Sequence, residues 1–219
     1  LYLNESKTQY INLCTAANTD KIKTLKEVEL KEVDDYKYLG SYISSSLKDF
    51  NIRKALAWSA CNDMHNIWTS EIGTNLKVQI FQIAIEPILL YGSETWTFTK
   101  AMEKRLDGTY TRLLMRAKNL SWKNHPSKEQ IYGKLPTVSE LIKARRVQFA
   151  GHCYRAENEV ISSLVLWSPK AHSRSRKLSY PAMIARDTNL EKQDLSRAMQ
   201  DRNFWRSRVN SIVSTAVAL

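Results

Sequence analysis

The chain has 219 residues, 43% of them hydrophobic and 10% aromatic, with a formal net charge of +11 and a pI near 9.6. A chain of this size and composition can bury a sizeable core, which excludes an intrinsically disordered protein and a small domain that depends on disulfides. Its most apolar segment, residues 76–91, is interrupted by charged and amide side chains and is too short to cross a bilayer, so we expect no membrane partner.

The positive charge is concentrated in the second half of the chain. Residues 1–99 contain 10 Lys and Arg against 12 Asp and Glu, whereas residues 100–219 contain 23 against 10. A polyanion is the natural partner of such a surface, because neutralised phosphates release condensed counterions. The alternative is a solvated basic face that only keeps the protein in solution.

The cysteines and the first residues indicate an intracellular protein. Cys14, Cys61 and Cys153 are an odd number and lie far apart in the sequence, which is typical of reduced thiols. The chain opens on Leu1 rather than on a methionine and shows no secretory signal pattern. We therefore interpret it as a fragment of an intracellular protein.

The first fifty residues carry strand-like patterns. We expect strands at 7–13, 25–33 and 36–43, the last because it is rich in tyrosine. The polar pair Asp34-Asp35 marks a turn between two of them. After Asp49 the pattern changes to that of helices. These observations predict a mainly α fold with a small N-terminal β portion, an α+β protein in which a helical bundle is followed by further helices.

Two helices are predicted between residues 57 and 92. The first has an apolar face with the three-to-four spacing of a helix, made of Ala57, Cys61, Met64 and Trp68. For the second, Thr74 is a suitable N-cap, and the helix should run to Ile88. It is apolar nearly all round, which is typical of the central helix of a bundle. Pro87 should bend this helix near Ile83, and Gly92 should end it in the left-handed conformation.

A third helix, from about Lys100 to Lys118, combines a buried stripe with a basic one. The apolar positions that should pack are Met102, Leu106, Tyr110, Leu113 and Ala117. At 100° per residue, Arg105, Arg112 and Arg116 fall within about 40° of one another on a different face. We expect this arginine face to meet either phosphate or water.

The segment after residue 136 begins with a helix start signal. Thr137 and Glu140 have the spacing of a capping box. The helix that follows should carry Lys143, Arg145 and Arg146 outward and pack through Leu141, Ile142 and Phe149. Gly151-His152 should interrupt or end it.

Beyond this helix, a basic loop and further helices are expected. Residues 168–181 are poor in apolar side chains, which predicts a mobile loop containing Arg174, Arg176 and Lys177. Residues 190–213 should form one or two helices. Their core-facing positions would be Leu195, Met199, Trp205, Val209 and Ile212.

Two groups of residues could hold a metal ion, but each has a simpler interpretation. Cys61 and His65 share a helix face, although no second pair of ligands lies nearby, so a packed thiol and a surface imidazole are favoured. Asp34-Asp35 could bind divalent metals for nucleotidyl transfer, but the flanking residues are mixed and charged rather than strongly apolar. A turn with solvated carboxylates is the favoured interpretation, and we expect no metal or cofactor on this chain.

Six stretches occur in the order found in one known family. They are Leu3-Asn4 with Lys7-Thr8, Tyr36 to Ser41 (YKYLGS), Ile88 to Trp96 (ILLYGSETW), Arg145-Arg146 with Gly151-His152 and Arg155, Leu166 to Pro169 (LWSP), and Met199 with Asp201-Arg202 and Trp205-Arg206. With these stretches the chain resembles the C-terminal part of the reverse transcriptase of non-LTR (LINE-type) retrotransposons, in the group that includes RTE-like elements. The resemblance covers essentially the whole chain.

This resemblance implies a division of the chain into three parts. Residues 1–48 would be the end of the palm with the primer-grip strands, residues 49–120 a helical thumb, and residues 121–219 a basic helical region. Lys7 would correspond to a lysine that protonates the departing pyrophosphate, unless it is only a surface lysine at a strand end. Tyr38, Leu39 and Gly40 would form the primer grip.

The resemblance also implies partners. RNA and DNA, as a primer–template or hybrid, would be gripped by Arg105, Arg112 and Arg116 of the thumb, and by Lys143, Arg145, Arg146 and the 173–177 loop. Some of these charges would only be solvated. The family's metal-binding aspartates lie upstream of Lys7, in the fingers and palm that these 219 residues do not contain. Mg²⁺ is expected only there, and polymerase activity is not expected from these residues alone.

One departure from the family pattern keeps an alternative open. Arg174, Ser175 and Arg176 stand where the family usually has Gly, Arg and Pro, which predicts that the loop has lost its turn. A decayed or domesticated remnant that acts as a helical protein-interaction module is therefore the alternative, and a small metal-binding module is a third. The leading interpretation is a nucleic-acid-gripping fragment that acts in the nucleus or between nucleus and cytoplasm.

Overall fold

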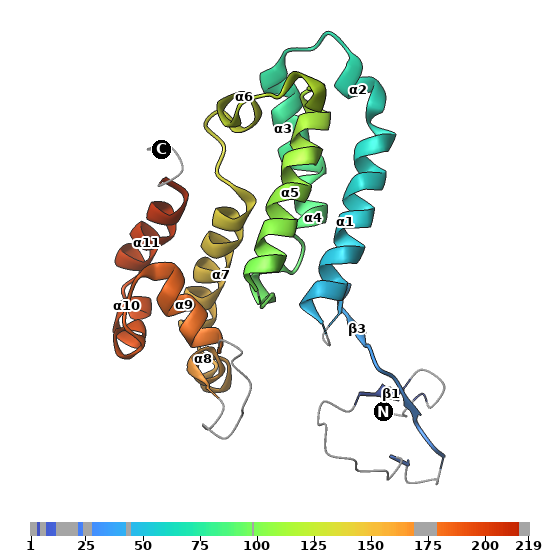
Figure 1. The fold of residues 1–219 in the computed structure, drawn as a ribbon. Helices are drawn as coiled ribbons and strands as arrows, with labels where there is room; N and C mark the ends of the chain where they lie inside the picture. Colours follow the sequence, from blue (N-terminus) through green and yellow to red (C-terminus); the bar gives the residue numbers. More distant parts are fainter. Residues whose placement is uncertain are drawn as a thin grey trace. The chain divides into compact units, whose positions relative to one another are not determined.

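The computed structural model describes residues 4, 8–11, 22–23, 28–42, 45–97, 99–168 and 179–214. These residues are mostly helical, with a few short strands near the N-terminus, which confirms the predicted mainly α fold (Figure 1). The chain divides into two compact units, Leu1–Ile52 and Arg53–Leu219, which we call the N-terminal unit and the helical unit. The division falls inside the first long helix, α1 (Ser46–Asp63).

The N-terminal unit contains two pairs of two-residue strands. β1 (Gln9–Tyr10) pairs in parallel with β2 (Lys31–Glu32), and β3 (Lys37–Tyr38) pairs antiparallel with β4 (Ser41–Tyr42). The single strand predicted over 36–43 is therefore wrong. Leu39 and Gly40 both have positive φ, 47° and 89°, the backbone of a two-residue hairpin turn.

A buried carboxylate joins this hairpin to the start of α1. Asp49 is buried, and its side chain accepts hydrogen bonds from Ser41 Oγ at 2.7 Å and from the Tyr42 backbone N–H at 3.3 Å. Because a buried carboxylate needs such donors, the hairpin and the first turn of α1 hold each other in place.

The predicted helices between residues 57 and 92 form, each with one break. α1 and α2 (His65–Thr69) are separated at Met64, and α3 (Thr74–Ala84) and α4 (Glu86–Leu89) are separated at Ile85. The second break lies where the bend was expected, because Pro87 has no N–H to donate to the Ile83 carbonyl. Gly92 has φ 72° and precedes the short 3₁₀ turn η1 (Ser93–Thr95), as predicted.

Two details of α3 were predicted wrongly. Gly73 occupies the N-cap position, and Thr74 is already the first helical residue. The helix is also not buried all round, since Leu76 and Ile83 are exposed. An apolar composition does not bury every face of a helix when neighbours pack against one side only.

α5 (Lys100–Ala117) forms as predicted, with Thr99 as its N-cap and with all five predicted apolar positions buried. It packs against α3, α6 (Lys128–Tyr132) and α7 (Val138–Tyr154). The 3₁₀ turn η2 (Trp122–Asn124) lies in the connection between α5 and α6. The predicted capping box is present at the start of α7, where the Thr137 side chain and the Glu140 side chain each bond to the other's backbone N–H.

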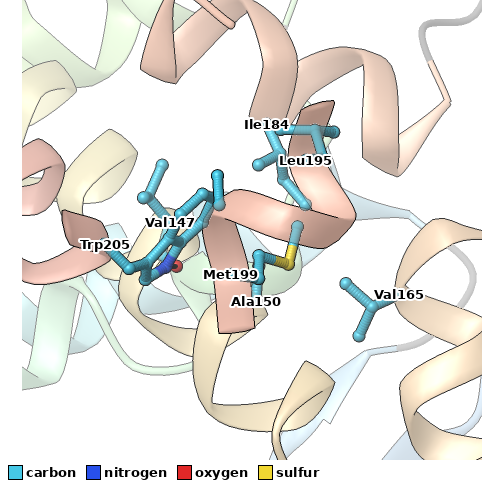
Figure 2. Close-up of a cluster of buried hydrophobic side chains, with 8 residues drawn as sticks. Val147, Ala150, Val165, Ile184, Leu195, Met199 and Trp205 are labelled. Carbon is cyan, nitrogen blue, oxygen red and sulfur yellow. Dashed lines mark hydrogen bonds between the residues drawn. The ribbon is translucent and has the colours of Figure 1, made fainter. Parts of the chain in front are cut away.

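The remaining helices pack on α7 around one apolar cluster (Figure 2). They are α8 (Glu159–Leu166), α9 (Tyr180–Thr188), the 3₁₀ turn η3 (Lys192–Asp194), α10 (Leu195–Gln200) and α11 (Arg202–Ser214). The cluster contains Leu195, Met199 and Trp205, and Val209 and Ile212 pack at its edge, all as predicted. None of the helices within the described ranges is long and apolar enough to span a bilayer.

Three predictions for this region are wrong. Gly151 and His152 lie inside α7, which continues to Tyr154. Phe149 is 40% exposed and does not pack in the core. The predicted loop over 168–181 ends earlier, because Tyr180 and Pro181 form the first turn of α9, where proline fits well. The rest of that loop, residues 169–178, lies outside the described residues.

Candidate nucleic-acid interface

The three arginines of α5 lie on its exposed face. Arg105, Arg112 and Arg116 are all exposed, and they occupy one side of the helix, beside its buried stripe rather than opposite it. Arg112 Nε donates to the Gly108 carbonyl at 3.0 Å, and Arg116 Nη2 lies 3.3 Å from His65 Nδ1 on α2. The predicted basic face, distinct from the buried stripe, is therefore present on this helix.

Buried contacts determine which face of α5 points outward. Tyr110 packs edge-on against Phe81 and stacks on Tyr132, with ring centroids 5.4 Å and 6.3 Å apart. Its hydroxyl donates to Glu86 Oε2 on α4 at 2.8 Å. Burial raises the pKa of Glu86, although the Tyr110 hydrogen bond and Arg145 oppose the shift, and burial also raises the pKa of Tyr110.

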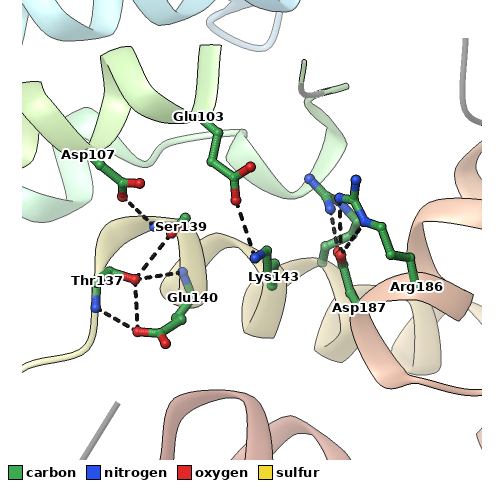
Figure 3. Close-up of polar contacts among 9 residues, drawn as sticks. Glu103, Asp107, Thr137, Ser139, Glu140, Lys143, Arg186 and Asp187 are labelled. Atoms are coloured by element: carbon green, nitrogen blue, oxygen red, sulfur yellow. Dashed lines mark hydrogen bonds and ion pairs between the residues drawn. The ribbon is translucent and has the colours of Figure 1, made fainter. Parts of the chain in front are cut away.

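Polar contacts hold α5 against α7 on another side (Figure 3). Asp107 Oδ1 accepts the Ser139 backbone N–H at 3.1 Å, and Glu103 Oε1 lies 3.2 Å from Lys143 Nζ. Burial raises the pKa of Asp107, and the Ser139 hydrogen bond opposes that shift. Because these carboxylates face α7, the acidic side chains of α5 are turned away from its arginines.

The basic residues of α7 do not form the outward-facing set that was predicted. Lys143 is half-buried in its pair with Glu103. Arg145 is also half-buried, with Nη2 3.8 Å from Glu86 Oε1 and Nη1 donating to the Leu90 carbonyl at 3.3 Å. Either residue would have to exchange an intramolecular partner before it could bind phosphate.

The outward prediction for Arg146 is wrong. Its side chain has no solvent exposure, and its Nη1 lies 2.5 Å from Asp187 Oδ2 on α9, whose side chain is 1% exposed. Its Nη2 donates to the Trp96 carbonyl at 3.1 Å. Arg145 and Arg146 are about 100° apart on a helix, so the burial of one and the partial exposure of the other follow from which face of α7 meets α9.

Three of the six sequence stretches, at residues 88–96, 145–155 and 199–206, contact one another. Arg145 and Arg146 bond to two carbonyls of the ILLYGSETW stretch, those of Leu90 and of its last residue, Trp96. Gly151 lies directly beneath the Trp205 indole, whose Nε1 donates to the Val147 carbonyl at 2.7 Å. Most of these residues therefore serve packing.

Hydrogen bonds from two of these stretches also hold the start of α11 and the end of α7. Asp201 caps its first turn, accepting from the backbone N–H groups of Asn203 and Phe204 at 3.0 Å. Arg155 Nη1 donates to the Met199 carbonyl at 2.5 Å. These contacts join the end of α7 to the last two helices.

The residues expected to form a primer grip lie at the turn of the β3–β4 hairpin. Tyr38 is 58% exposed and Leu39 is 75% exposed. A left-handed leucine is uncommon, and such backbone strain is concentrated at functional sites. The structure thus places two large side chains in solvent on a tight turn, within the N-terminal unit.

Four candidate residues lie outside the described residues, namely Lys7, Arg174, Arg176 and Lys177. Of the acidic pair, Asp34 is exposed at a bend and Asp35 forms an ion pair with Lys48. Cys61 is buried, which raises the pKa of its thiol, while His65 is exposed. Within the described ranges, no three His, Cys, Asp or Glu side chains are grouped so that they could hold a metal ion.

A further basic segment was not singled out from the sequence. Residues 108–128 contain five Lys and Arg and no Asp or Glu. The segment includes Arg112 and Arg116 of α5 and continues into the α5–α6 connection, where Trp122 is 71% exposed. A scan for runs without acidic residues that contain an aromatic would have found it.

Comparison with known proteins points to a transposable element. No protein-family model matches the chain, and no solved structure matches it significantly. The chain is similar to a putative uncharacterized transposon-derived protein of Caenorhabditis elegans, with 28% identity over 151 residues. The match covers 64% of this chain and 54% of that protein, so the chain spans about half the length of this curated relative. The similarity indicates an origin in a transposable element.

Proposed function

We propose that the chain grips nucleic acid as the thumb and C-terminal part of a reverse transcriptase from a non-LTR retrotransposon. The six ordered sequence stretches and the similarity to a transposon-derived protein support this proposal. Its partners would be RNA and DNA in a primer–template or hybrid, together with the fingers and palm of the parent polymerase. The reaction would take place with Mg²⁺ in those parts.

The observation that carries the proposal is the exposed arginine face of α5. Arg105, Arg112 and Arg116 lie along one side of a helix whose other sides are fixed by buried contacts. A guanidinium binds phosphate oxygens in pairs, and contacts of this kind position a duplex without reading its sequence. A fixed row of three would follow the backbone of a hybrid.

Other residues would have supporting parts. Tyr38, Leu39 and Gly40 of the hairpin would contact the primer end, mainly through backbone and shape. Lys143 and Arg145 would extend the track only after leaving Glu103 and Glu86. Arg146 would hold α7, α9 and Trp96 together rather than touch phosphate.

Binding of a fluorescent RNA–DNA hybrid, measured by anisotropy at several salt concentrations, tests the proposal. We expect sequence-independent binding with a steep salt dependence. The triple variant Arg105→Gln, Arg112→Gln, Arg116→Gln should weaken binding and reduce the slope of log K against log salt by about 2 to 3. A matched control replaces the exposed Lys192, Arg197 and Arg206 by Gln, and it should change the slope less.

Two results would overturn the proposal. One is the absence of hybrid binding at low salt, and the other is an equal loss of binding in the two triple variants, because the charge would then act without a defined site. Primer extension in Mg²⁺ by these 219 residues alone would contradict the expectation that they cannot polymerise.

An exposed apolar surface favours the second candidate, a protein-interaction module. Val160 and Leu164 of α8 are more than half exposed, and Trp167 is 62% exposed. Leu164 and Trp167 line a pocket of about 320 Å³ together with Phe149, Tyr180 and other, mostly apolar, residues. This candidate predicts a stable protein partner that Leu164→Glu releases and that competes with the hybrid. A partner that binds together with the hybrid would contradict it.

A further inference from the structure

The α5–α6 connection presents a tryptophan to solvent. Trp122 is 71% exposed, more than any other tryptophan of the chain. Burying an indole contributes strongly to stability, so a tryptophan outside the core forgoes that contribution. It follows Arg116, the last arginine of the α5 face, by six residues, which suggests that the indole is used on the same partner.

The backbone of this connection is held by local hydrogen bonds on both sides of Trp122. Leu120 N–H donates to the Met115 carbonyl at 2.8 Å and Asn119 N–H to the Arg116 carbonyl at 3.1 Å, with Asn119 left-handed at φ 56°. This is the Schellman arrangement that ends a helix. Trp122 is therefore presented from a defined turn directly after α5.

The far side of the connection is equally defined. Ser127 and Gln130 form a capping box at the start of α6. Lys118 Nζ donates to the Gln130 carbonyl at 3.1 Å and so bridges the two ends. Because the turn is already ordered, less conformational entropy is lost when a ligand binds.

The charge around the indole selects the partner. Lys123, His125 and Lys128 are exposed one to six residues after it, and the run 108–128 has no acidic residue, although Glu129 follows it directly. An apolar protein surface would gain little from these cations, whereas a nucleic acid offers both phosphates and flat aromatic bases. Basic grooves with exposed aromatic side chains are the usual means of binding unpaired nucleotides.

We propose that Trp122 stacks on an unpaired base beside a hybrid whose backbone lies on the α5 arginines. Inside a duplex both faces of every base are covered, so away from the duplex ends the indole can stack only where a strand is unpaired. This inference rests on the proposed hybrid binding and adds to it a stacking site for a single-stranded overhang.

The test uses the 219-residue chain and two hybrids of equal length, one blunt and one with a short single-stranded overhang carrying 2-aminopurine. We expect the overhang to bind more tightly and its 2-aminopurine fluorescence to change on binding. Trp122→Leu should abolish that change and weaken overhang binding about tenfold, and Trp122→Phe should restore most of it. Blunt-hybrid binding should change less than twofold.

Trp167→Leu is the matched control, because Trp167 is also largely exposed and lies on another part of the helical unit. It should leave the 2-aminopurine change intact. If Trp122→Leu binds the overhang as the wild type does, or if Trp167→Leu causes the same loss, the stacking site is refuted while hybrid binding stands. If the wild type binds neither hybrid, both proposals fail.

Discussion

Replacing Gly151 by alanine should destabilise the helical unit, although alanine is the better helix former. Gly151 lies within α7, where the change alone would favour the helix by about 1 kcal/mol. A Cβ atom at this position, however, would overlap the Nε1 and Cδ1 atoms of Trp205 and approach Arg155 Nη1 to 3.1 Å. The Trp205 indole would have to move.

The cost of that movement can be estimated from its contacts. Trp205 is 2% exposed in the cluster of Figure 2, and forcing extra volume into such a core costs about 1–3 kcal/mol. Separating its Nε1 from the Val147 carbonyl would leave a buried donor unpaired, at about 1–3 kcal/mol more. After the gain in helix propensity, we expect a net loss of about 3 kcal/mol.

Gly108→Ala is the matched control, because Gly108 lies in the middle of α5 and a Cβ there would meet nothing within 4 Å. It should stabilise the protein by about 1 kcal/mol. Urea unfolding followed by circular dichroism measures both changes. If Gly151→Ala is as stable as the wild type or more so, the close packing of Trp205 on α7 is wrong.

Two further predictions concern buried ionisable groups. Arg146→Met should lower the free energy of unfolding by about 3 kcal/mol in the same assay, because the buried carboxylate of Asp187 would lose Arg146 and keep only the half-exposed Arg186; a loss under 1 kcal/mol would contradict the buried pair. Burial raises the pKa of Glu86 above its ordinary value of 4.5 in the folded protein. The wild type should therefore lose stability as the pH rises from the pKa of the unfolded chain to the higher pKa of the folded one. Glu86→Gln lacks this loss, and its melting temperature relative to the wild type should increase from about pH 4 to 7; a flat difference would refute the raised pKa.

The recognised stretches have a physical explanation that the sequence alone did not supply. Leu90 and Trp96 lie in one stretch and Arg145 and Arg146 in another, and the structure joins them through a part-buried and a buried hydrogen bond. A resemblance carried by residues that make such contacts is evidence about the fold rather than about nucleic-acid binding. Of the proposed contacts with nucleic acid, those of Tyr38 to Gly40 and of Arg145 fall in these stretches, whereas the exposed Arg112 and Trp122 belong to none of the six.

The amino-acid sequence by itself determined the features that depend on neighbours along the chain. The capping box of Thr137 and Glu140, the break before Pro87 and the left-handed Gly92 follow from backbone hydrogen bonding and φ preferences within a few residues. The buried and basic faces of α5 follow in the same way from helical periodicity.

Only the tertiary structure decided features whose partners are distant in sequence. Asp187 lies 41 residues after Arg146, and nothing near Arg146 indicates that this arginine, rather than Arg145, is buried. Gly151 resembles a helix terminator until Trp205 is seen to occupy the space where a side chain would be. The turn at Leu39 likewise contradicts local preference, since leucine disfavours positive φ. In each case a contact or a backbone conformation outweighed the local signal, which is why pattern alone could not predict it.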